Sequence, residues 1–515
     1  MTEKYTFIAL DVGTHAVRAC VFFLGGVASV WTMGEVFSAD IDLYSPQPRH
    51  IEQNPEALLQ ALQMVYGQAL NFAINEGLCT DSIRVGMAVQ RSSVMAWERI
   101  SGSPSSPILS WQDTRAFLTI EQLSPAEREN IMALTGLRPS PHYGASKLLC
   151  LQQQLVLPAN NNATVMGPLA AWLIKQLTGN HYCDPVNAAR TLLFNRQRAN
   201  WDKTLCNIFG VMHTLLPAVQ KSAARYGDIQ WAGSEQLPGS KSVGAQLVAV
   251  LGDQNAAYVA MRYSQLPESV NFKNPLVMNI GSGAFVLGQC DKENDSSALG
   301  LLTSLVFSCG DTEAWLMEGT VNNAGTALSH WRENLAEPLS ESSLFTQLPQ
   351  WLEADSLCED ESPCFYLNTA AGIGSPFWLS RFKPSTHVFI NNAGECCCPS
   401  IPQQAVAIIN SIAFLIVANI LQFQKIPAAC GYDGILATGG LSRVGGLIEK
   451  ISDLCGLPIF VTKCHETTLQ GTAMLGSEFI YKPRLHGHIV AAKKSSPVLL
   501  KRYERYIQLI QAQAL

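Results

Sequence analysis

The sequence predicts an α/β protein made of two similar domains that face each other. A chain of 515 residues favours two or more domains and is long enough to bury a large core. The chain carries both short apolar runs of strand length and longer segments expected to be helical. A strand–turn–strand pattern occurs once in each half of the chain. This duplication indicates two domains of the same construction.

The composition is that of a soluble globular protein, with 47% hydrophobic and 15% charged residues. The net charge is −6 and no run of Lys and Arg stands out, so neither nucleic acid nor an anionic membrane is a predicted partner. The N-terminal residues 1–5 lack the basic and then apolar pattern of a signal peptide. We therefore expect a cytoplasmic protein.

The longest apolar stretch and the cysteines have ordinary explanations. Residues 405–421 include Asn410, Ser411 and Asn419, and 17 residues are few for a membrane span of about 20, so a buried core helix is predicted. The 15 cysteines are odd in number and contain no CxxC pair. The adjacent cysteines 396–398 cannot easily converge on one metal ion, which favours reduced thiols over a metal site or a disulfide framework.

The first strand–turn–strand pattern opens the chain. A strand over residues 5–10 leads into Asp11-Val12-Gly13-Thr14, and strands over 17–24 and 27–31 follow, which predicts hairpins. Asp11 could be a plain turn former. The functional alternative is a metal-bound carboxylate, with Gly13 and Thr14 donating hydrogen bonds to phosphate.

The second copy of the pattern comes about half the chain length later. A strand over residues 275–280, the turn 281–283 and a strand over 284–288 repeat the order of the first copy. Glycine has no Cβ, so such a turn can bring backbone N–H groups close to an anion. We expect the phosphates of a nucleotide to lie between the two turns.

Asp253 follows an apolar run over residues 247–251 that breaks at Gly252. A strand-end turn is the commoner explanation of the Gly-Asp-Gln sequence. Phosphorylation of an alcohol, however, needs a group that orients and deprotonates the hydroxyl, and donors that hold the phosphates. An acid that follows one strand, together with two glycine turns, could meet both needs.

The remaining elements follow from capping and apolar spacing. Asn54 and Pro55 begin a helix that we expect to run to Leu70. Two glycines after a strand over 434–437 place N–H groups at a helix N-terminus, where adenosine or phosphate can dock; a tight connection is the alternative. Other expected elements are strands over 85–89 and 457–461, and helices over 447–451, 466–476 and 493–515.

Together, these segments resemble the FGGY family of carbohydrate kinases, and within it the glycerol kinases most closely. The resemblance rests on the order and spacing of the motifs over nearly the whole chain, because each motif alone is loose. The matching segments are Asp11–Thr14 with Arg18, Gly252–Gln254, Gly281–Phe285 and Gly439–Ser442. Further similar segments are Trp111–Arg115, Asn187–Thr191, Glu318–Gly319 with Ala324–Gly325, and Gly372–Trp378.

The resemblance implies two ribonuclease-H-like α/β domains of the actin and hexokinase type, with a central cleft. Residues 1–249 would form the N-terminal domain that binds the sugar or polyol acceptor. Residues 250–515 would form the C-terminal domain that binds ATP. Closure of the cleft would expel water and prevent wasteful hydrolysis of ATP.

The resemblance also implies roles for single residues. Asp253 would accept the proton of the acceptor hydroxyl, and Arg18 would stabilise the charge that develops on the phosphoryl group; a surface arginine is the alternative. Asp11 would hold Mg²⁺ through water. The residues expected to contact ATP are Gly13, Thr14, Gly281, Ser282, Gly325, Gly439, Gly440 and Leu441. Those expected at the acceptor are Arg91, Ser92, Trp111, His142, Asp253, Gln254 and Phe285.

The expected acceptor site departs from the glycerol kinases at two positions. Ser92 replaces a glutamate that accepts hydrogen bonds from glycerol, and such a charged hydrogen bond is worth roughly 1.5–3 kcal/mol. His142 replaces a tyrosine, although Tyr143 could serve if the loop shifts by one residue, and a structural loop histidine is equally open. A roomier pocket for a longer polyol or a ketose is therefore expected.

The function predicted is an ATP- and Mg²⁺-dependent kinase that phosphorylates a terminal hydroxyl of a small polyol or sugar. A pentulose kinase of the xylulokinase type is the nearest alternative, although residues 90–93 lack that group's Gln-Met-His-Gly. A non-catalytic ATP-binding sensor of the same fold is the rival from another class. Formation of a homodimer is a possibility that the sequence leaves undecided.

Overall fold

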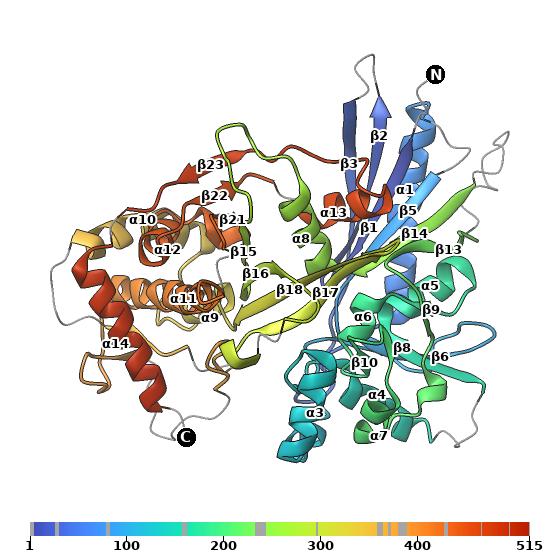
Figure 1. Ribbon diagram of the computed structural model, residues 1–515, viewed down its shortest axis with the longest axis horizontal. Coiled ribbons are helices and arrows are strands. Elements are labelled where there is room, and N and C mark those ends of the chain that lie inside the picture. The colour runs from blue at the N-terminus through green and yellow to red at the C-terminus, as the bar shows by residue number, and fades with distance from the viewer. Residues whose placement is uncertain are drawn as a thin grey trace. The chain divides into compact units, whose positions relative to one another are not determined.

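The computed structural model divides into two compact units, and each unit is described by itself (Figure 1). Unit 1 comprises Met1–Gln265, Thr303–Trp315 and Glu466–Pro483, and unit 2 comprises Leu266–Leu302, Leu316–His465 and Arg484–Leu515. The structure describes residues 5–25, 30–78, 83–156, 162–231, 244–294, 297–357, 364–368, 372–379, 389–426, 431–464, 466–493 and 495–513.

Unit 1 is built on a mixed sheet whose middle strands are parallel. Its strand order is β17 (Leu302–Cys309), β13 (Ala223–Asp228), β14 (Ala245–Gly252), β5 (Ile83–Val89), β1 (Thr6–Val12), β2 (Ala16–Gly25) and β3 (Val30–Asp40). All seven residues of β1 are buried, which explains its continuous apolar sequence.

Three parallel strands of this sheet end at one edge. β1 and β14 both run parallel to β5, and Val12 and Gly252 each pair with Val89 (Figure 1). The residues around these strand ends are therefore brought together although they are far apart in sequence. In α/β sheets, ligands bind outside the carboxyl ends of parallel strands.

Helices of unit 1 pack against this sheet. α8 (Asp253–Tyr263) begins directly at the end of β14, and α13 (Thr467–Gly476) packs on α8 and on β1. A Cβ at Gly471 would lie 1.8 Å from the carbonyl oxygen of Ala256, so only glycine permits this close approach of α13 to α8. α1 (Pro55–Asn75) packs on β2 and β3 and begins at Asn54, which caps it as predicted.

A second sheet of unit 1 supports three loops that follow strands or precede a helix. Its order is β4 (Glu52–Gln53), β7 (Ile108–Leu109), β6 (Val94–Glu98) and β8 (Thr164–Pro168). The loop between β5 and β6 carries Gln90–Ser93, and the segment after β7 carries Ser110–Arg115. The third loop carries His142 and leads into α4 (Gly144–Gln154).

Other short elements complete unit 1. They are α2 (Phe117–Glu121), α3 (Pro125–Thr135), α5 (Leu169–Thr178), β9 (Tyr182–Cys183), α6 (Pro185–Ala189), β10 (Phe194–Asn195), β11 (Asn200–Trp201), α7 (Lys203–Phe209) and β12 (Ala218–Val219).

Unit 2 repeats the mixed-sheet plan around its own core. Its strand order is β23 (Gly487–Val490), β22 (Ile459–Thr462), β21 (Ile435–Thr438), β15 (Leu276–Ile280), β16 (Ala284–Cys290) and β18 (Thr312–Val321), whose residues from Leu316 onward belong to this unit. The helices are α9 (Gly325–Glu333), α10 (Glu341–Leu357), α11 (Ile401–Phe423), α12 (Leu447–Cys455) and α14 (Pro497–Gln513), with the short strands β19 (Phe365–Tyr366) and β20 (Phe389–Ile390).

The predicted core helix is α11. Among the described residues it is the helix that is long and apolar enough to cross a membrane, yet 89% of its apolar window is buried. It packs against α10, α12, α14 and β16. Neighbouring protein thus covers its apolar surface on nearly every side, as in the core helix of a globular domain.

Most predicted elements are confirmed, and two differ. The third strand was predicted over residues 27–31, but β3 runs from Val30 to Asp40, while 26–29 lie outside the described residues. After β21, the helix does not begin at the two glycines. Gly440–Arg443 form a 3₁₀ turn first, and α12 begins only at Leu447. The left-handed Gly439 and Gly446, at φ 95° and 89°, interrupt a continuous helix there.

A cluster of charged side chains joins four helices of unit 2. Asp355 of α10 accepts hydrogen bonds from Lys450 Nζ at 2.8 Å and from Arg502 Nη1 at 2.9 Å. Lys450 also donates to Asn410 Oδ1 of α11 at 2.7 Å. Burial alone would raise the pKa of Asp355, but Lys450 and then Arg502 hold it below its usual value. The C-terminal helix α14 is thereby tied to the core.

We expect Asp355→Asn to lower the free energy of unfolding by about 3 kcal/mol at neutral pH, because two buried cations lose their counter-charge. A carboxyl with a lowered pKa stabilises the fold above its unfolded-state pKa. The difference should therefore shrink as the pH falls through the lowered pKa of Asp355. Thermal melting over a pH series measures it. Glu504→Gln, at an exposed position of α14, is the control, and an equal effect of both substitutions would contradict the prediction.

Candidate active site

Asp11 lies at the end of β1 and is almost fully buried, with 2% of its surface exposed. The register of the β1–β2 hairpin places Arg18 directly opposite Asp11. Arg18 Nη2 contacts Asp11 Oδ2 at 2.5 Å, and Nη1 contacts Glu466 Oε2 at 3.0 Å. Arg18 thus links the hairpin to the start of α13.

Burial raises the pKa of Asp11 to about 6, although Arg18 acts in the opposite direction. The negative charge of Asp253 raises this pKa further, and so does Glu466. Several carboxylates of unit 1 therefore share one small region. A divalent cation bound there would relieve their repulsion.

The turn after β1 is held by hydrogen bonds from its own hairpin and from two glutamine side chains. Gly13 N donates to Ala16 O at 3.0 Å, and this bond closes the hairpin. Behind the turn, Gln90 Nε2 donates to Gly13 O at 3.2 Å, and Gln53 Nε2 donates to Thr14 O at 2.8 Å. Gln90 Nε2 also donates to Gln53 Oε1 at 2.8 Å. Two buried amides therefore hold the turn from behind.

Asp253 is the first residue of α8, and Arg91 lies beside it. Arg91 Nε is 3.9 Å from Asp253 Oδ1. The guanidinium donates to Gln254 Oε1, and to Asn255 Oδ1 at 3.2 Å. A Cβ at Gly252 would lie 2.6 Å from Arg91 Cγ, so the glycine provides the space for this side chain.

Burial raises the pKa of Asp253 above its usual value, while Arg91 and Arg190 act in the opposite direction. Arg190 in turn donates to Ser304 Oγ at 3.2 Å. A carboxylate whose pKa is raised by burial is a stronger base than one in water. Such perturbed groups cluster at functional sites.

Ser92, Trp111 and His142 lie on three segments that are bonded to one another. Trp111 N donates to Ser93 Oγ at 3.0 Å, and His142 Nδ1 is 3.2 Å from Trp111 O. The Trp111 indole Nε1 donates to Thr14 Oγ1 at 3.0 Å, while 39% of the Trp111 surface is exposed. A partly exposed aromatic side chain is thus anchored beside the Gly13–Thr14 turn.

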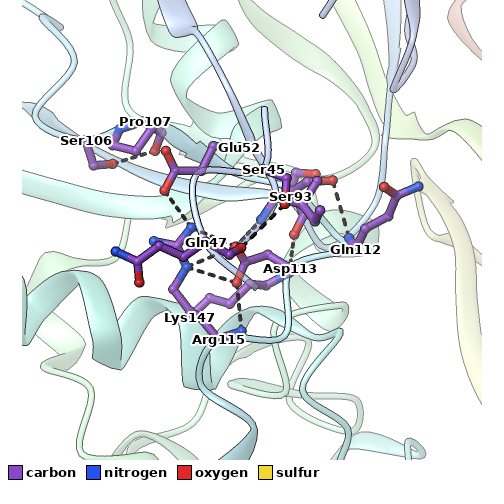
Figure 2. A network of polar contacts seen from close by, with 12 residues as sticks. Ser45, Gln47, Glu52, Ser93, Ser106, Pro107, Gln112, Asp113, Arg115 and Lys147 are labelled. Carbon is purple, nitrogen blue, oxygen red and sulfur yellow. Dashed lines mark hydrogen bonds and ion pairs between the residues drawn. The ribbon is translucent and has the colours of Figure 1, made fainter. Parts of the chain in front are cut away.

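Figure 2 shows the polar network around Asp113 and Arg115, in the segment that follows Trp111. Arg115 bridges Glu52 and Asp113, with Nη2–O distances of 2.6 and 2.7 Å. Asp113 Oδ2 also accepts from Ile51 N at 2.7 Å, and Lys147 lies close to the same group (Figure 2). These contacts fix the segment that carries Trp111 to the strand β4.

In unit 2, the predicted nucleotide-binding glycines converge on the β15–β16 turn. Gly281 N donates to Gly283 O at 2.9 Å, and Gly325 N donates to Gly281 O at 2.9 Å. A Cβ at Gly325 would lie 2.7 Å from Gly281 O, and one at Gly439 would lie 2.5 Å from Ile280 O. Three chain segments therefore meet at backbone distance, which requires glycine.

The other predicted residues of unit 2 lie near this turn. Thr326 N and Oγ1 both donate to Ser282 O, at 3.2 and 3.1 Å. Leu441 is buried, and a Cβ at Gly440 would meet no atom within 4 Å. Phe285 pairs with Asn279 in the β15–β16 ladder. The side of Gly440 is thus open for a ligand.

The predicted residues therefore form two groups, one in each unit. In unit 1 the structure brings together Asp11, Gly13, Thr14, Arg18, Arg91, Ser92, Trp111, His142, Asp253 and Gln254. In unit 2 it brings together Gly281, Ser282, Phe285, Gly325, Gly439, Gly440 and Leu441. The roles of these residues stay predictions.

Sequence reasoning missed three supporting residues. Glu466 contacts Arg18 across 448 positions of sequence, and no local pattern could have revealed it. Gln90 adjoins the predicted Arg91, yet its partners include Gly13 O and the Gln53 side chain, which are distant in sequence. Lys147 donates to carbonyl groups of three loops, and no local pattern indicated these contacts.

Comparison with protein families decides the class. A model described as "FGGY family of carbohydrate kinases, N-terminal domain" matches residues 6–260, and the corresponding C-terminal domain matches residues 276–477. The chain belongs to the FGGY family of carbohydrate kinases. This FGGY kinase is therefore a phosphotransferase with an alcohol group as acceptor.

Curated relatives of this FGGY kinase are named glycerol kinase. One from Thermus brockianus is 29% identical over 91% of this chain and 89% of its own length. One from Nitrosomonas eutropha is 26% identical over 92% of this chain and 89% of its own length. The predicted family and its resemblance to the glycerol kinases are confirmed.

Solved structures agree on the fold. The glycerol kinase of Plasmodium falciparum with ADP has a TM-score of 0.80 at 20% identity, and covers 99% of this chain and 98% of its own. A ligand-bound xylulose kinase from Lactobacillus acidophilus has a TM-score of 0.76 at 16% identity with the same coverage. The predicted two-domain α/β fold of the actin and hexokinase type is confirmed for this FGGY kinase.

We expect Asp11→Asn to stabilise the protein at pH 7.5 by about 2–3 kcal/mol, because it removes a buried charge whose pKa is about 6 instead of 3.8. A carboxyl with a raised pKa lowers stability as the pH rises from about 4 to 6. The gain should therefore shrink as the pH falls toward 4.

Thermal melting of Asp11→Asn at pH 7.5 and pH 4.5 measures this gain. Asp42→Asn, at an exposed position, is the control for a neutralised carboxyl in the same unit. A lower melting temperature of Asp11→Asn at pH 7.5 would contradict the prediction.

Proposed function

We propose that this protein transfers the γ-phosphoryl group of ATP to a terminal hydroxyl of a small polyol or sugar, as a glycerol-kinase-like enzyme. The observation that carries this proposal is the pair of Asp253 and Arg91 at one strand end, beside the hairpin of Asp11 and Arg18. The first pair supplies a base and its partner for an alcohol. The pair of Asp11 and Arg18 supplies a carboxylate for a metal ion and a cation for the phosphoryl group.

Asp253 is proposed to orient the acceptor hydroxyl and to take its proton. Its pKa is raised by burial, which makes it a better base at neutral pH. In a loose phosphoryl-transfer transition state, little negative charge has to form on the attacking oxygen. The work of Asp253 is therefore mainly positioning, followed by late removal of the proton.

Asp11 is proposed to hold Mg²⁺ through water. Mg²⁺ commonly uses one or two carboxylates together with substrate phosphates, so a single buried carboxylate with a raised pKa fits this ion. When bound, Mg²⁺ would neutralise charge on the phosphates. Arg18 is proposed to stabilise charge on the transferred group, and the backbone of Gly13 and the hydroxyl of Thr14 to contact phosphate.

The unit 2 residues are proposed to hold the rest of ATP. The backbones of Gly281, Ser282 and Gly325 would contact phosphate, and Gly439, Gly440 and Leu441 would pack against adenosine. We propose that the acceptor binds within residues 1–249 and ATP within residues 250–515, with a closed state during the transfer. Closure would exclude water from the transfer.

The acceptor is proposed to be a longer polyol or a ketose. Arg91, Trp111, Gln254 and Phe285 would contact it, and Ser92 and His142 would leave more room than glutamate and tyrosine. Xylulose kinases are also among the structural neighbours, so a pentulose kinase is the second candidate. We further propose a cytoplasmic location, with a homodimer left open.

An acceptor panel tests the proposed function against the sensor of the same fold. Release of ADP is measured with ATP, Mg²⁺ and each of a series of polyols and ketoses. The proposal expects at least one acceptor to raise turnover well above the rate with ATP alone. If none does so while ATP still binds, the protein is a non-catalytic ATP-binding sensor.

We expect Asp253→Asn to reduce turnover by several orders of magnitude, because an amide cannot accept the hydroxyl proton. ATP affinity should change little, since this side chain is not proposed to contact the nucleotide. Steady-state kinetics and ATP titration measure the two effects. Asp228→Asn, at an exposed position of β13, is the control, and retained activity of Asp253→Asn would remove this residue from the mechanism.

We expect Ser92→Glu to raise kcat/KM for glycerol by roughly 10- to 150-fold, the equivalent of one charged hydrogen bond. Ser92→Gln is the matched control, because it has the same length without the charge. Both variants carry the same strain at the left-handed backbone of this position, where φ is 67°. If Ser92→Glu and Ser92→Gln change kcat/KM for glycerol equally, a missing carboxylate does not explain the poor use of glycerol.

A further inference from the structure

Lys147 of α4 is fully buried, and its ammonium group lies at the meeting point of three loops. Its Nζ donates to Ser92 O at 2.8 Å, to Ser110 O at 2.9 Å and to His142 O at 2.9 Å. An ammonium group has three N–H donors, so these three carbonyls use all of them. Figure 2 shows Lys147 below the segment that carries Asp113.

We propose that Lys147 is a positioning residue for the acceptor, because it holds three separate segments of the acceptor site in one arrangement. The inference rests on the proposed function. The three segments carry Ser92, Trp111 and His142, which are the side chains proposed to shape the acceptor pocket. Lys147 itself is buried, and its ammonium group donates to backbone carbonyls of these segments, so its effect on the acceptor passes through these residues.

The three segments depend on this contact because secondary structure does not join them all. The first follows β5, the second follows β7 and the third precedes α4. The first two segments are also joined by the pairing of Val94 in β6 with Leu109 in β7 and by the bond from Trp111 N to Ser93 Oγ. The third contacts the second through His142 Nδ1 and Trp111 O. Lys147 adds one bond to each segment from a common point. Its removal would leave three carbonyl groups facing a buried gap.

The charge state of Lys147 decides how many carbonyls it can hold. Burial lowers the pKa of Lys147 to about 7; Asp113 acts against this shift and Arg115 reinforces it. His142 is another titratable group beside it. Burial lowers the pKa of its imidazole, the contact with Trp111 O acts against this shift, and Lys147 lowers the pKa further. A neutral amine has only two N–H donors, so one segment would lose its bond as the pH rises above about 7.

Lys450 provides a natural contrast within the same chain. It is likewise buried, but its Nζ donates to the side chains of Asp355 and Asn410 in unit 2. None of these residues belongs to the proposed acceptor site. Removal of either ammonium group should cost stability, whereas only removal of the Lys147 ammonium should alter acceptor binding.

The test compares Lys147→Met with Lys450→Met, since methionine keeps most of the lysine stem. We expect Lys147→Met to raise the acceptor KM by at least about tenfold, because the three loops lose the ammonium group that holds them in one arrangement. The ATP KM should change less than about twofold. Lys450→Met should lower the melting temperature and leave both KM values unchanged. A parallel change of both KM values in Lys147→Met, or no change in either, would overturn the proposal.

The wild-type enzyme provides a second test that does not depend on the folding of a variant. Its acceptor KM should rise on the order of tenfold between pH 7 and 8.5, while its ATP KM stays level. Lys147→Arg, which keeps its charge over this range, should flatten the acceptor profile. A level acceptor profile of the wild type would overturn the proposal. Absence of phosphoryl transfer to every acceptor would instead contradict the proposed function itself.

Discussion

The parallel pairing of β14, β5 and β1 is the constraint on which the candidate site depends. Val12 and Gly252 pair with the same residue of β5, so the ends of the outer strands are fixed to one edge of the sheet. Asp11 and Asp253 are thereby placed in the same region of unit 1, although 241 positions separate them in sequence. Neither side chain could be moved away without a change of strand register.

This constraint has an electrostatic cost that only a function explains. Burial raises the pKa of both carboxyls, and the charge of Asp253 adds to the shift at Asp11. Arg18 and Arg91 offset part of that cost. A purely structural strand end would do better with neutral residues. The remaining cost is consistent with a site that takes up a cation and accepts a proton.

The sequence predicted the local features well because their causes are local. Asn54 caps α1, the glycine turns follow β1 and β15, and the apolar stretch within α11 is a core helix. The 3₁₀ turn at Gly440 was not predicted, because it depends on how closely Gly439 approaches β15. Likewise, β3 extends beyond its short apolar start because it pairs with the full length of β2.

The site was predictable as a set of residues but not as a network. The family motifs indicated Asp11, Arg91, Trp111 and Asp253. They could not indicate that the amides of Gln53 and Gln90 hold the Gly13–Thr14 turn, or that one ammonium group joins three loops. Those contacts depend on the placement of distant segments, which no single stretch of sequence encodes.

Family membership defines the reaction class, whereas the choice of acceptor is proposed to depend on the loops of Ser92, Trp111 and His142. The most direct measurement is a crystal structure with a bound acceptor. The account predicts that a hydroxyl oxygen of the acceptor lies within hydrogen-bonding distance of an Asp253 carboxylate oxygen, with its carbon chain against Trp111. An acceptor bound away from Asp253, with that carboxylate facing only protein, would contradict it.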